Sequence, residues 1–437
     1  MKISLGKVAL ILMVFTAASG TSFAAPISLR ESLTEAVSKN PLLAEGRLGV
    51  AAGEQSVTSA FGKHLPRLAL DASYTRRQDP LPFVPAQSIT IPAHFSDEFA
   101  GWQATLVLPL YQGGQIVSGV RLAEVRRAIQ ENTLTLTRNE IIANTVNTYN
   151  KLLQLGKLRE ASQASVDALA EQAKNAELLL NLGRIARVDL LKVEVQLSNE
   201  RQRLASIDEG IAVTRETLAF LMGRSVDAGG SELESAGELR LDPVAADFER
   251  GLASAHERRP EYLIARQGMK EAEFTARISK GKLLPTINLF GGYLDQYGFD
   301  PWHQEANWVG GVSASLPLFD RSLHADLARD RILRERAQTH LVSVENQLRL
   351  EIRTAIASLA ESGNRVESSR QAVQQADESF RIEQEKYNSG AGAMVDLLLA
   401  QAADFTAAAN HSQALFDYNA ALVAWRKAAG ILEEYLQ

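Results

Sequence analysis

The distribution of proline is the feature that most constrains the fold. All 13 prolines lie within residues 26–109 and 243–317, so residues 110–242 and 318–437 contain none. Proline breaks the hydrogen bonding of a helix interior at a cost of about 3 kcal/mol, and its absence therefore permits very long helices. A helix over residues 115–181 would be about 100 Å long, which exceeds any compact globular domain. The sequence therefore predicts helical rods.

Apolar residues within these two stretches recur at alternating intervals of three and four. That spacing places them in one seam along a helix, which is typical of coiled coils, and alanines in the seam allow neighbouring helices to approach closely. The pattern fits either an ordinary coiled-coil filament or a tube built from long helices. One seam in each half consists of Val166, Leu169, Ala173, Ala176 and Leu180, and of Leu415, Tyr418, Leu422, Trp425, Ala429 and Leu432.

The two halves of the chain repeat each other. Asn40-Pro41 recurs 219 residues later as Arg259-Pro260, and Val188-Asp189-Leu190-Leu191 recurs 207 residues later as Val395-Asp396-Leu397-Leu398. We therefore expect two structural repeats, residues 26–242 and 243–437, each with a helix, a strand pair and a long helix hairpin. The first repeat has 11 extra residues, which fall in the proline-rich segment 78–98 and predict an exposed loop.

Each repeat contains two segments in which apolar and polar residues alternate, at about residues 67–77, 101–110, 286–295 and 308–318. Leu68, Leu70 and Tyr74, for example, alternate with Ala69, Asp71 and Ser73. A period of two over about ten residues, with aromatic residues at the tips, is typical of strands in a membrane barrel. A small soluble hairpin beneath the helices is the alternative.

Residues 1–25 are predicted to be a cleaved signal peptide. Lys2 and Lys7 precede the apolar run 8–18, and small residues around Ala24 supply a cleavage site. An exported chain with strands at symmetric positions favours a barrel in the outer membrane. Four strands cannot close such a barrel, because known barrels begin at eight strands. Three chains would supply twelve strands, which enclose a lumen.

The leader, the duplication and the entry from strand to long helix at Leu110-Tyr111-Gln112-Gly113-Gly114 resemble the TolC family of outer-membrane efflux proteins. The resemblance implies a mainly α fold: an antiparallel coiled-coil tunnel continuous with a transmembrane β-barrel of four strands per chain and twelve per trimer. It implies a passive homotrimeric channel in the cell outer membrane, in contact with its lipid and extended through the periplasm. It also implies a periplasmic adaptor and an inner-membrane pump as partners, in an efflux or type I secretion system.

The resemblance further implies a gate at the two turns between the long helices. Gly183, Gly390 and Gly392 lie in these turns, and the gate candidates are Asp396, Asp189, Tyr387, Arg187 and Arg184. The plainer interpretation of the two aspartates is that each stabilises the start of a helix. Gly392 and Leu399 stand where some family members carry Arg and a second Asp, which leaves the locking of this gate open.

The sequence gives little support for other functions. The seven histidines show no close metal-ligand spacing, and the motifs of zinc proteases, dinucleotide binders and serine hydrolases are missing, so we expect no enzyme, cofactor or metal site. The formal charge of −6 argues against nucleic acid as a partner. With no cysteine, the chain has neither disulfides nor a lipidated N-terminal Cys. A soluble periplasmic coiled-coil adaptor or scaffold is the alternative to the channel.

Overall fold

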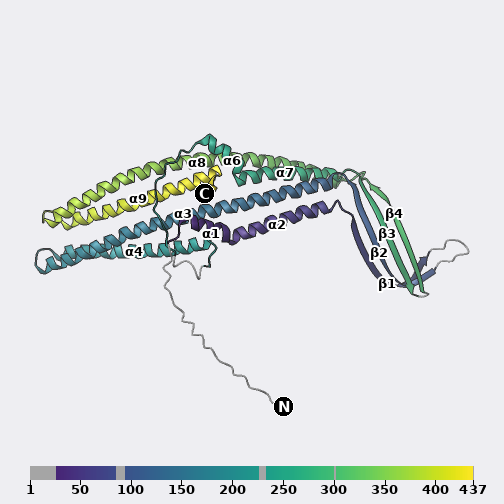
Figure 1. The fold of residues 1–437 in the computed structure, drawn as a ribbon, viewed down its shortest axis with the longest axis horizontal. Coiled ribbons are helices and arrows are strands. Elements are labelled where there is room, and N and C mark those ends of the chain that lie inside the picture. Colours follow the sequence, from purple (N-terminus) through teal and green to yellow (C-terminus); the bar gives the residue numbers. More distant parts are fainter. Residues whose placement is uncertain (1–25, 85–93, 226–232, 300–301, 437) are drawn as a thin grey trace, which may run out of the picture.

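The computed structural model describes residues 26–84, 94–225, 233–299 and 302–436, and the predicted signal peptide lies outside these residues. Long helices occupy most of the molecule, and one sheet lies at the far end of the helices (Figure 1). The elements of the first half are α1 (Leu29–Lys39), α2 (Pro41–Gly62), β1 (Arg67–Val84), β2 (His94–Gln112), α3 (Gln115–Asn181) and α4 (Arg187–Leu221). Those of the second half are α6 (Phe248–Arg258), α7 (Pro260–Gly281), β3 (Thr286–Phe299), β4 (Trp302–Ser315), α8 (Arg321–Asn388) and α9 (Met394–Ala429), followed by the 3₁₀ helix η1 (Leu432–Leu436). The order of helices and strands is the same in both halves.

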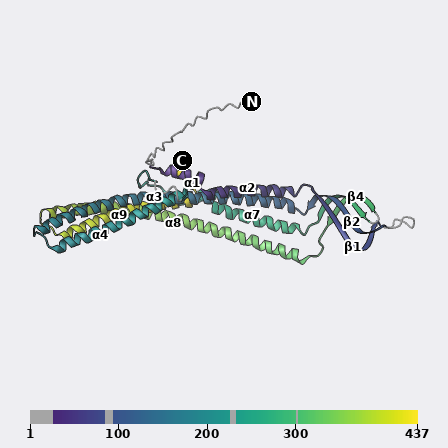
Figure 2. The same ribbon diagram turned by 90° about the horizontal axis from the view of Figure 1, so that it is seen from below.

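Helices α3 and α8 run through the whole helical part. With 67 and 68 residues, each is about 100 Å long. The bounds of α3 agree with the helix predicted from the proline-free stretch. Near the sheet, α3 packs against α2 and α7, and α7 packs against α8 (Figure 2). Towards the opposite end, α4 pairs with α3 and α9 pairs with α8, so that two antiparallel hairpins lie side by side.

The apolar seams form the cores between these helices. In the first half, Tyr149, Ile207 and Leu218 are buried in one cluster, and in the second half Tyr418, Leu422 and Trp425 are buried in another. One seam prediction was wrong in its extent, because α9 ends at Ala429. Gly430 has a φ of 73°, which turns the chain out of the helix, and Leu432 is buried in η1 against the first half instead.

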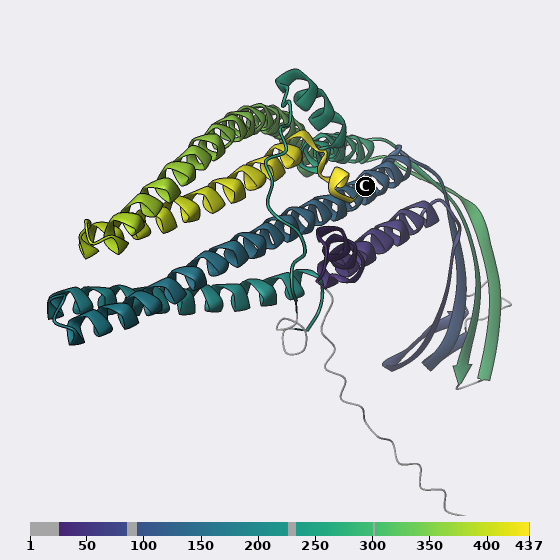
Figure 3. The ribbon, with the colours of Figure 1, turned by 60° about the vertical axis from the view of Figure 1, so that its left-hand side comes forward.

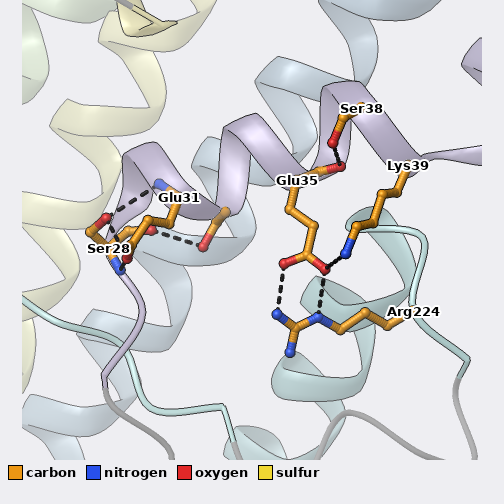
Figure 4. Close-up of polar contacts among 7 residues, drawn as sticks. Ser28, Glu31, Glu35, Ser38, Lys39 and Arg224 are labelled. Atoms are coloured by element: carbon orange, nitrogen blue, oxygen red, sulfur yellow. Dashed lines mark hydrogen bonds and ion pairs between the residues drawn. The ribbon is translucent and has the colours of Figure 1, made fainter.

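Short elements bind the two hairpins together near the middle of the molecule. Ser28 and Glu31 form a reciprocal capping box at the start of α1, and Glu35 of α1 bonds to Arg224 beyond the end of α4 at 2.6 and 3.0 Å (Figure 4). The segment 233–247 then crosses from the end of α4 to α6 (Figure 3). Tyr149 of α3 and Tyr418 of α9 each donate a hydrogen bond to its backbone, so this crossing segment is fixed to both halves.

The sheet is antiparallel in the order β1-β2-β3-β4, which confirms the predicted four strands. The expected loop at 78–98 was wrong in part, because β1 continues to Val84 and β2 begins at His94. Pro80 and Pro82 are tolerated there because β1 is an edge strand, and its register shifts between Arg76 and Leu81. At the other edge, β4 begins at Trp302 and ends at Ser315, so Pro317 lies beyond the strand instead of within it. Strand β3 also runs further than expected, to Phe299.

Candidate functional site: an apolar sheet face and two helix-hairpin tips

The sheet presents two chemically different faces. Residues paired across antiparallel strands lie on the same face, so the register assigns every strand residue to one side. The first side, here called the apolar face, consists of Leu68, Leu70, Ala72 and Tyr74; Ala100, Trp102, Ala104, Leu106 and Leu108; Leu289, Gly291, Tyr293, Asp295 and Tyr297; and Gln304, Ala306, Trp308, Gly310 and Val312. The second side, the polar face, includes Arg67, Asp71, Ser73, Thr75, Gln103, Thr105, Asn288, Gln296, Glu305 and Asn307.

Nothing in the described chain covers the apolar face. Leu70 is 71% exposed and Trp308 is 80% exposed, although both are large and apolar. Aromatic rings gather along it, with Trp102 and Tyr293 at a centroid distance of 5.3 Å. Two carboxylates on this face both have partners: Asp295 is buried and accepts hydrogen bonds from Tyr297 and Gln304, and Glu98 pairs with Arg76. A contiguous apolar surface of this kind requires a non-aqueous neighbour.

No helix among the described residues has the length and apolar content that a bilayer crossing demands.

The hairpin tips at the opposite end are built by two matching turns. Gly183 and Gly390 have φ values of 67° and 78°, which only glycine adopts readily. In the first turn, Gly183 N–H donates to Leu180 and Arg184 N–H donates to Leu179; in the second, Gly390 N–H donates to Tyr387 and Ala391 N–H donates to Lys386. These paired bonds define Schellman motifs, which end α3 and α8 and satisfy their last carbonyl groups.

Gly392 is required for a different reason. A Cβ at this position would lie 2.9 Å from the backbone nitrogen of Tyr387 and 3.0 Å from Cβ of Lys386. Its own N–H donates a further bond to the carbonyl of Lys386 at 3.0 Å. A larger residue at this position would therefore need a different turn.

The predicted gate residues fall into two groups. Asp189 and Tyr387 lie near each other although they come from different hairpins: burial raises the pKa of Tyr387, and the negative charge of Asp189 raises it further. Asp189 also lies 3.4 Å from Lys192. By contrast, Arg184, Arg187 and Asp396 are exposed, and within the part of the chain that the structure describes their side chains have no polar partner. Both aspartates occupy the first turn of a helix, where a carboxylate is favoured.

An apolar cluster joins the two tips. Val193 and Leu197 of α4 pack with Met394, Leu397 and Leu398 of α9, and all five are buried. Beside this cluster, an open groove of about 410 Å³ lies between α4 and α9. Its exposed apolar lining comprises Val188, Leu191, Val195, Val395 and Leu399.

The sequence indicates only part of this groove. From the sequence, both Leu-Leu pairs near the tips are candidates for buried seam residues or for partner contacts. In the structure the two pairs differ in burial, since Leu397 and Leu398 are buried, whereas Leu191 is exposed. The valines at 188, 195 and 395 were missed. A clue existed in the paired Val-Asp-Leu-Leu motifs, but it does not reveal that the two helices lie next to each other.

Among the described residues, no group of three or more His, Cys, Asp or Glu side chains lies close enough together to hold a metal ion. The distinctive chemistry therefore lies at the two ends, an uncovered apolar sheet and a pair of polar hairpin tips, joined by helices of about 100 Å. This combination defines a class of protein in which a membrane-embedded sheet continues into a long helical tunnel.

Comparisons with known proteins agree. The profile of the family described as "Outer membrane efflux protein" matches residues 33–224 and 251–431. The chain belongs to this family, which is a family of transport proteins, and it is an outer-membrane efflux channel with a periplasmic extension.

Individual relatives are distant. The outer membrane protein TolC of Salmonella enteritidis is 23% identical over 433 residues, which cover 93% of this chain and 82% of that protein. Nodulation protein T of Rhizobium leguminosarum is 24% identical over 273 residues, which cover 60% of this chain and only 56% of that protein. The crystal structure of the outer membrane protein VceC from Vibrio cholerae has a similar fold, with a TM-score of 0.79 and 20% identity over 92% of this chain and 96% of that chain. None of these matches supports the soluble adaptor alternative.

Proposed function

We propose that three copies of this chain form one passive conduit, which carries substrates across the periplasm and the outer membrane. A periplasmic adaptor and an inner-membrane pump supply the substrate and the energy. The observation that carries the proposal is the sheet, which has an uncovered apolar face and two free edges, β1 and β4. In lipid, the backbone groups of those edges need hydrogen-bond partners.

Closure by three copies supplies these partners. Pairing β1 of one copy with β4 of the next gives twelve strands, above the smallest known membrane barrels of eight. The apolar face then lies against lipid and the polar face lines the lumen. The helices of each half continue from the sheet, so the same lumen extends into the helical part. This arrangement makes residues 26–242 and 243–437 two repeats of one wall element.

We further propose that the hairpin tips close the periplasmic end. Three copies bring three Asp396 side chains around the axis, and these like charges repel one another in a narrow opening. Arg184 and Arg187, which have no partner among the described residues of their own chain, are the available counter-ions. The buried apolar cluster between α4 and α9, with Tyr387 packed against it, holds the two hairpins of one copy together.

The adaptor would bind at the groove between α4 and α9, where apolar side chains are exposed. Since the chain has no cysteine, Leu399→Cys introduces a single thiol there. Leu399 is 64% exposed, whereas Leu397 is 2% exposed, so Leu397→Cys is a matched control. A thiol-specific crosslinker should join the adaptor to the first variant and not to the second.

The conduit itself is tested with the purified mature chain. Light scattering in detergent should give the mass of three chains, and insertion into planar bilayers should give discrete conductance steps. A monomer without conductance, or recovery of the protein from the soluble periplasm, would contradict the proposal.

A further inference from the structure

A hollow of about 930 Å³ lies where the sheet meets the end of α2. Its walls are the last turn of α2, the Leu65-Pro66 turn, and residues of β1, β2 and β3. With the exception of Leu68, the strand residues that line it belong to the polar face, including Asp71 and Asn288. The hollow therefore opens on the side of the sheet that lines the lumen in the proposed trimer.

The charges in this hollow are not balanced. Lys63 and Arg67 both line it and both are exposed, whereas Asp71 is its only carboxylate. Within the described chain, none of the three takes part in an ion pair or side-chain hydrogen bond. Each copy of the chain thus leaves one excess positive charge in this hollow.

The second repeat shows that this excess is specific to the first. Lys282 is the counterpart of Lys63, since both cap the helix that precedes a strand. Although burial opposes it, the pKa of Asp330 is lowered, because Ser279 and Arg329 bond to its carboxylate and Lys282 adds a nearby positive charge. Arg329 also pairs with Asp326 at 2.9 Å, so two carboxylates offset the charges of Arg329 and Lys282. The counterpart of Arg67 is Thr286, which carries no charge.

The geometry points to a cationic collar, formed by Lys63 and Arg67 of each copy at the junction of barrel and tunnel, that favours anionic substrates. This inference rests on the proposed trimeric conduit, which brings three such pairs around one lumen. Rings of charged side chains select ions in pores, and low-dielectric walls concentrate their field. The collar acts on carboxylate, phosphate or sulfate groups, and Arg67 can bind such groups in a bidentate manner.

Ion selectivity in planar bilayers tests the collar, with potassium chloride as the probe at about 0.1 M, where the screening length is about 10 Å. The double variant Lys63→Gln/Arg67→Gln should raise the ratio of potassium to chloride permeability, because it removes the excess positive charge. The charge-conserving variant Lys63→Arg/Arg67→Lys should keep the ratio of the wild type. Arg76→Gln is the matched control, because Arg76 lies on the apolar face of the same strand and pairs with Glu98 at 3.3 Å.

The outcomes separate the collar from the conduit. A shift in the neutral double variant alone supports the collar. An unchanged ratio in channels that conduct normally overturns the collar and leaves the conduit standing. An equal shift in Arg76→Gln also overturns it, since the effect would then not depend on the lumen face. If the wild-type trimer does not conduct at all, the conduit fails and the collar fails with it.

Discussion

Two glycines at equivalent positions should respond in opposite ways to the same substitution. Gly62 is the last residue of α2 and Gly281 is the last residue of α7. A Cβ on Gly62 would meet nothing within 4 Å. A Cβ on Gly281 would lie 2.7 Å from the carbonyl oxygen of Gly113 and 2.7 Å from Cγ of Gln115. The backbone of the second repeat therefore touches the β2–α3 junction of the first at this point.

The magnitudes follow from these distances. Alanine in place of glycine within a helix gains up to about 1 kcal/mol, so Gly62→Ala should stabilise the protein slightly. At Gly281 the same gain in helix propensity is opposed, because the new Cβ would overlap the backbone of Gly113. That backbone can move away only if the end of α7 and the β2–α3 junction separate. Overpacking of this kind costs about 1–3 kcal/mol. The two variants should therefore differ in stability by about 1–3 kcal/mol, with Gly281→Ala the less stable.

Gly113 cannot relieve the overlap. Its φ of 58° is a conformation that other residues adopt at a cost, and a Cβ there would overlap the carbonyl oxygen of Gly281. The assay is the loss of helical circular dichroism on heating the purified protein in detergent, at equal concentrations of each variant. If Gly281→Ala melts with or above Gly62→Ala, then the close crossing of the two repeats does not exist in solution.

The remaining predictions concern the gate, the lipid face and the central junction. Asp396→Ala should raise single-channel conductance because it removes the proposed acidic ring, and an unchanged conductance would remove Asp396 from the proposed gate. Leu70→Arg should lower the yield of membrane-inserted protein, since a cation facing lipid costs about 2–4 kcal/mol at the bilayer midplane. Ala69→Arg, on the polar face, is the control, and equal yields would contradict this assignment of the faces. Arg224→Gln should cost about 1–3 kcal/mol of stability at neutral pH, because the charged Glu35 loses its main partner. Hydrogen bonds from Arg224 lower the pKa of Glu35 below its ordinary 4.5; burial opposes this shift, and Lys39 adds to it. The stability that the Arg224–Glu35 pair contributes is therefore present above pH 4.5, and it is lost as the pH falls through the lowered pKa. Urea unfolding at a series of pH values from neutral to well below 4.5 checks this, and a difference between variant and wild type that does not shrink as the pH falls would refute it.

The long helices could be predicted because their signals are local. The bounds of α3 follow from the missing prolines and from Gly114 and Gly183 at its ends, and these signals lie within the helix and its caps. The strand ends could not be predicted in this way. Whether Pro80 interrupts a strand depends on its place at a sheet edge, which is decided by the partner strand.

The candidate sites were also predictable to different degrees, according to whether their signals are local in the sequence. Alternation within each strand indicated the apolar face, because the period of two is a local property. The proximity of Asp189 to Tyr387, and the groove between α4 and α9, arise from packing between hairpins that are about 200 residues apart in the chain. A seam pattern shows which face of a helix is buried without showing which helix covers it.

The side chains at equivalent positions of the two repeats differ in different ways at the centre and at the ends of the molecule. At the central junction, different side chains make equivalent hydrogen bonds. Asn40 Nδ2 donates to the carbonyl of Leu221 at the end of α4, and its counterpart Arg259 donates to the carbonyl of Ala428 at the end of α9. Helix ends leave such carbonyls without intrahelical partners, so either side chain serves.

At the two ends of the molecule, by contrast, the charged member of each equivalent pair makes no ion pair within the described chain, whereas Arg259 at the junction pairs with Glu261 and Glu351. Arg184 and Arg187 of the first tip correspond to Ala391 and Met394 of the second, and Arg67 corresponds to Thr286. Neutral counterparts are compatible with folding, because the backbone of each repeat adopts the same elements without these charges. The extra charges are therefore not needed to form the repeat. They lie at the hairpin tips and where the sheet meets the helices, which is what selection on substrates and partners would produce.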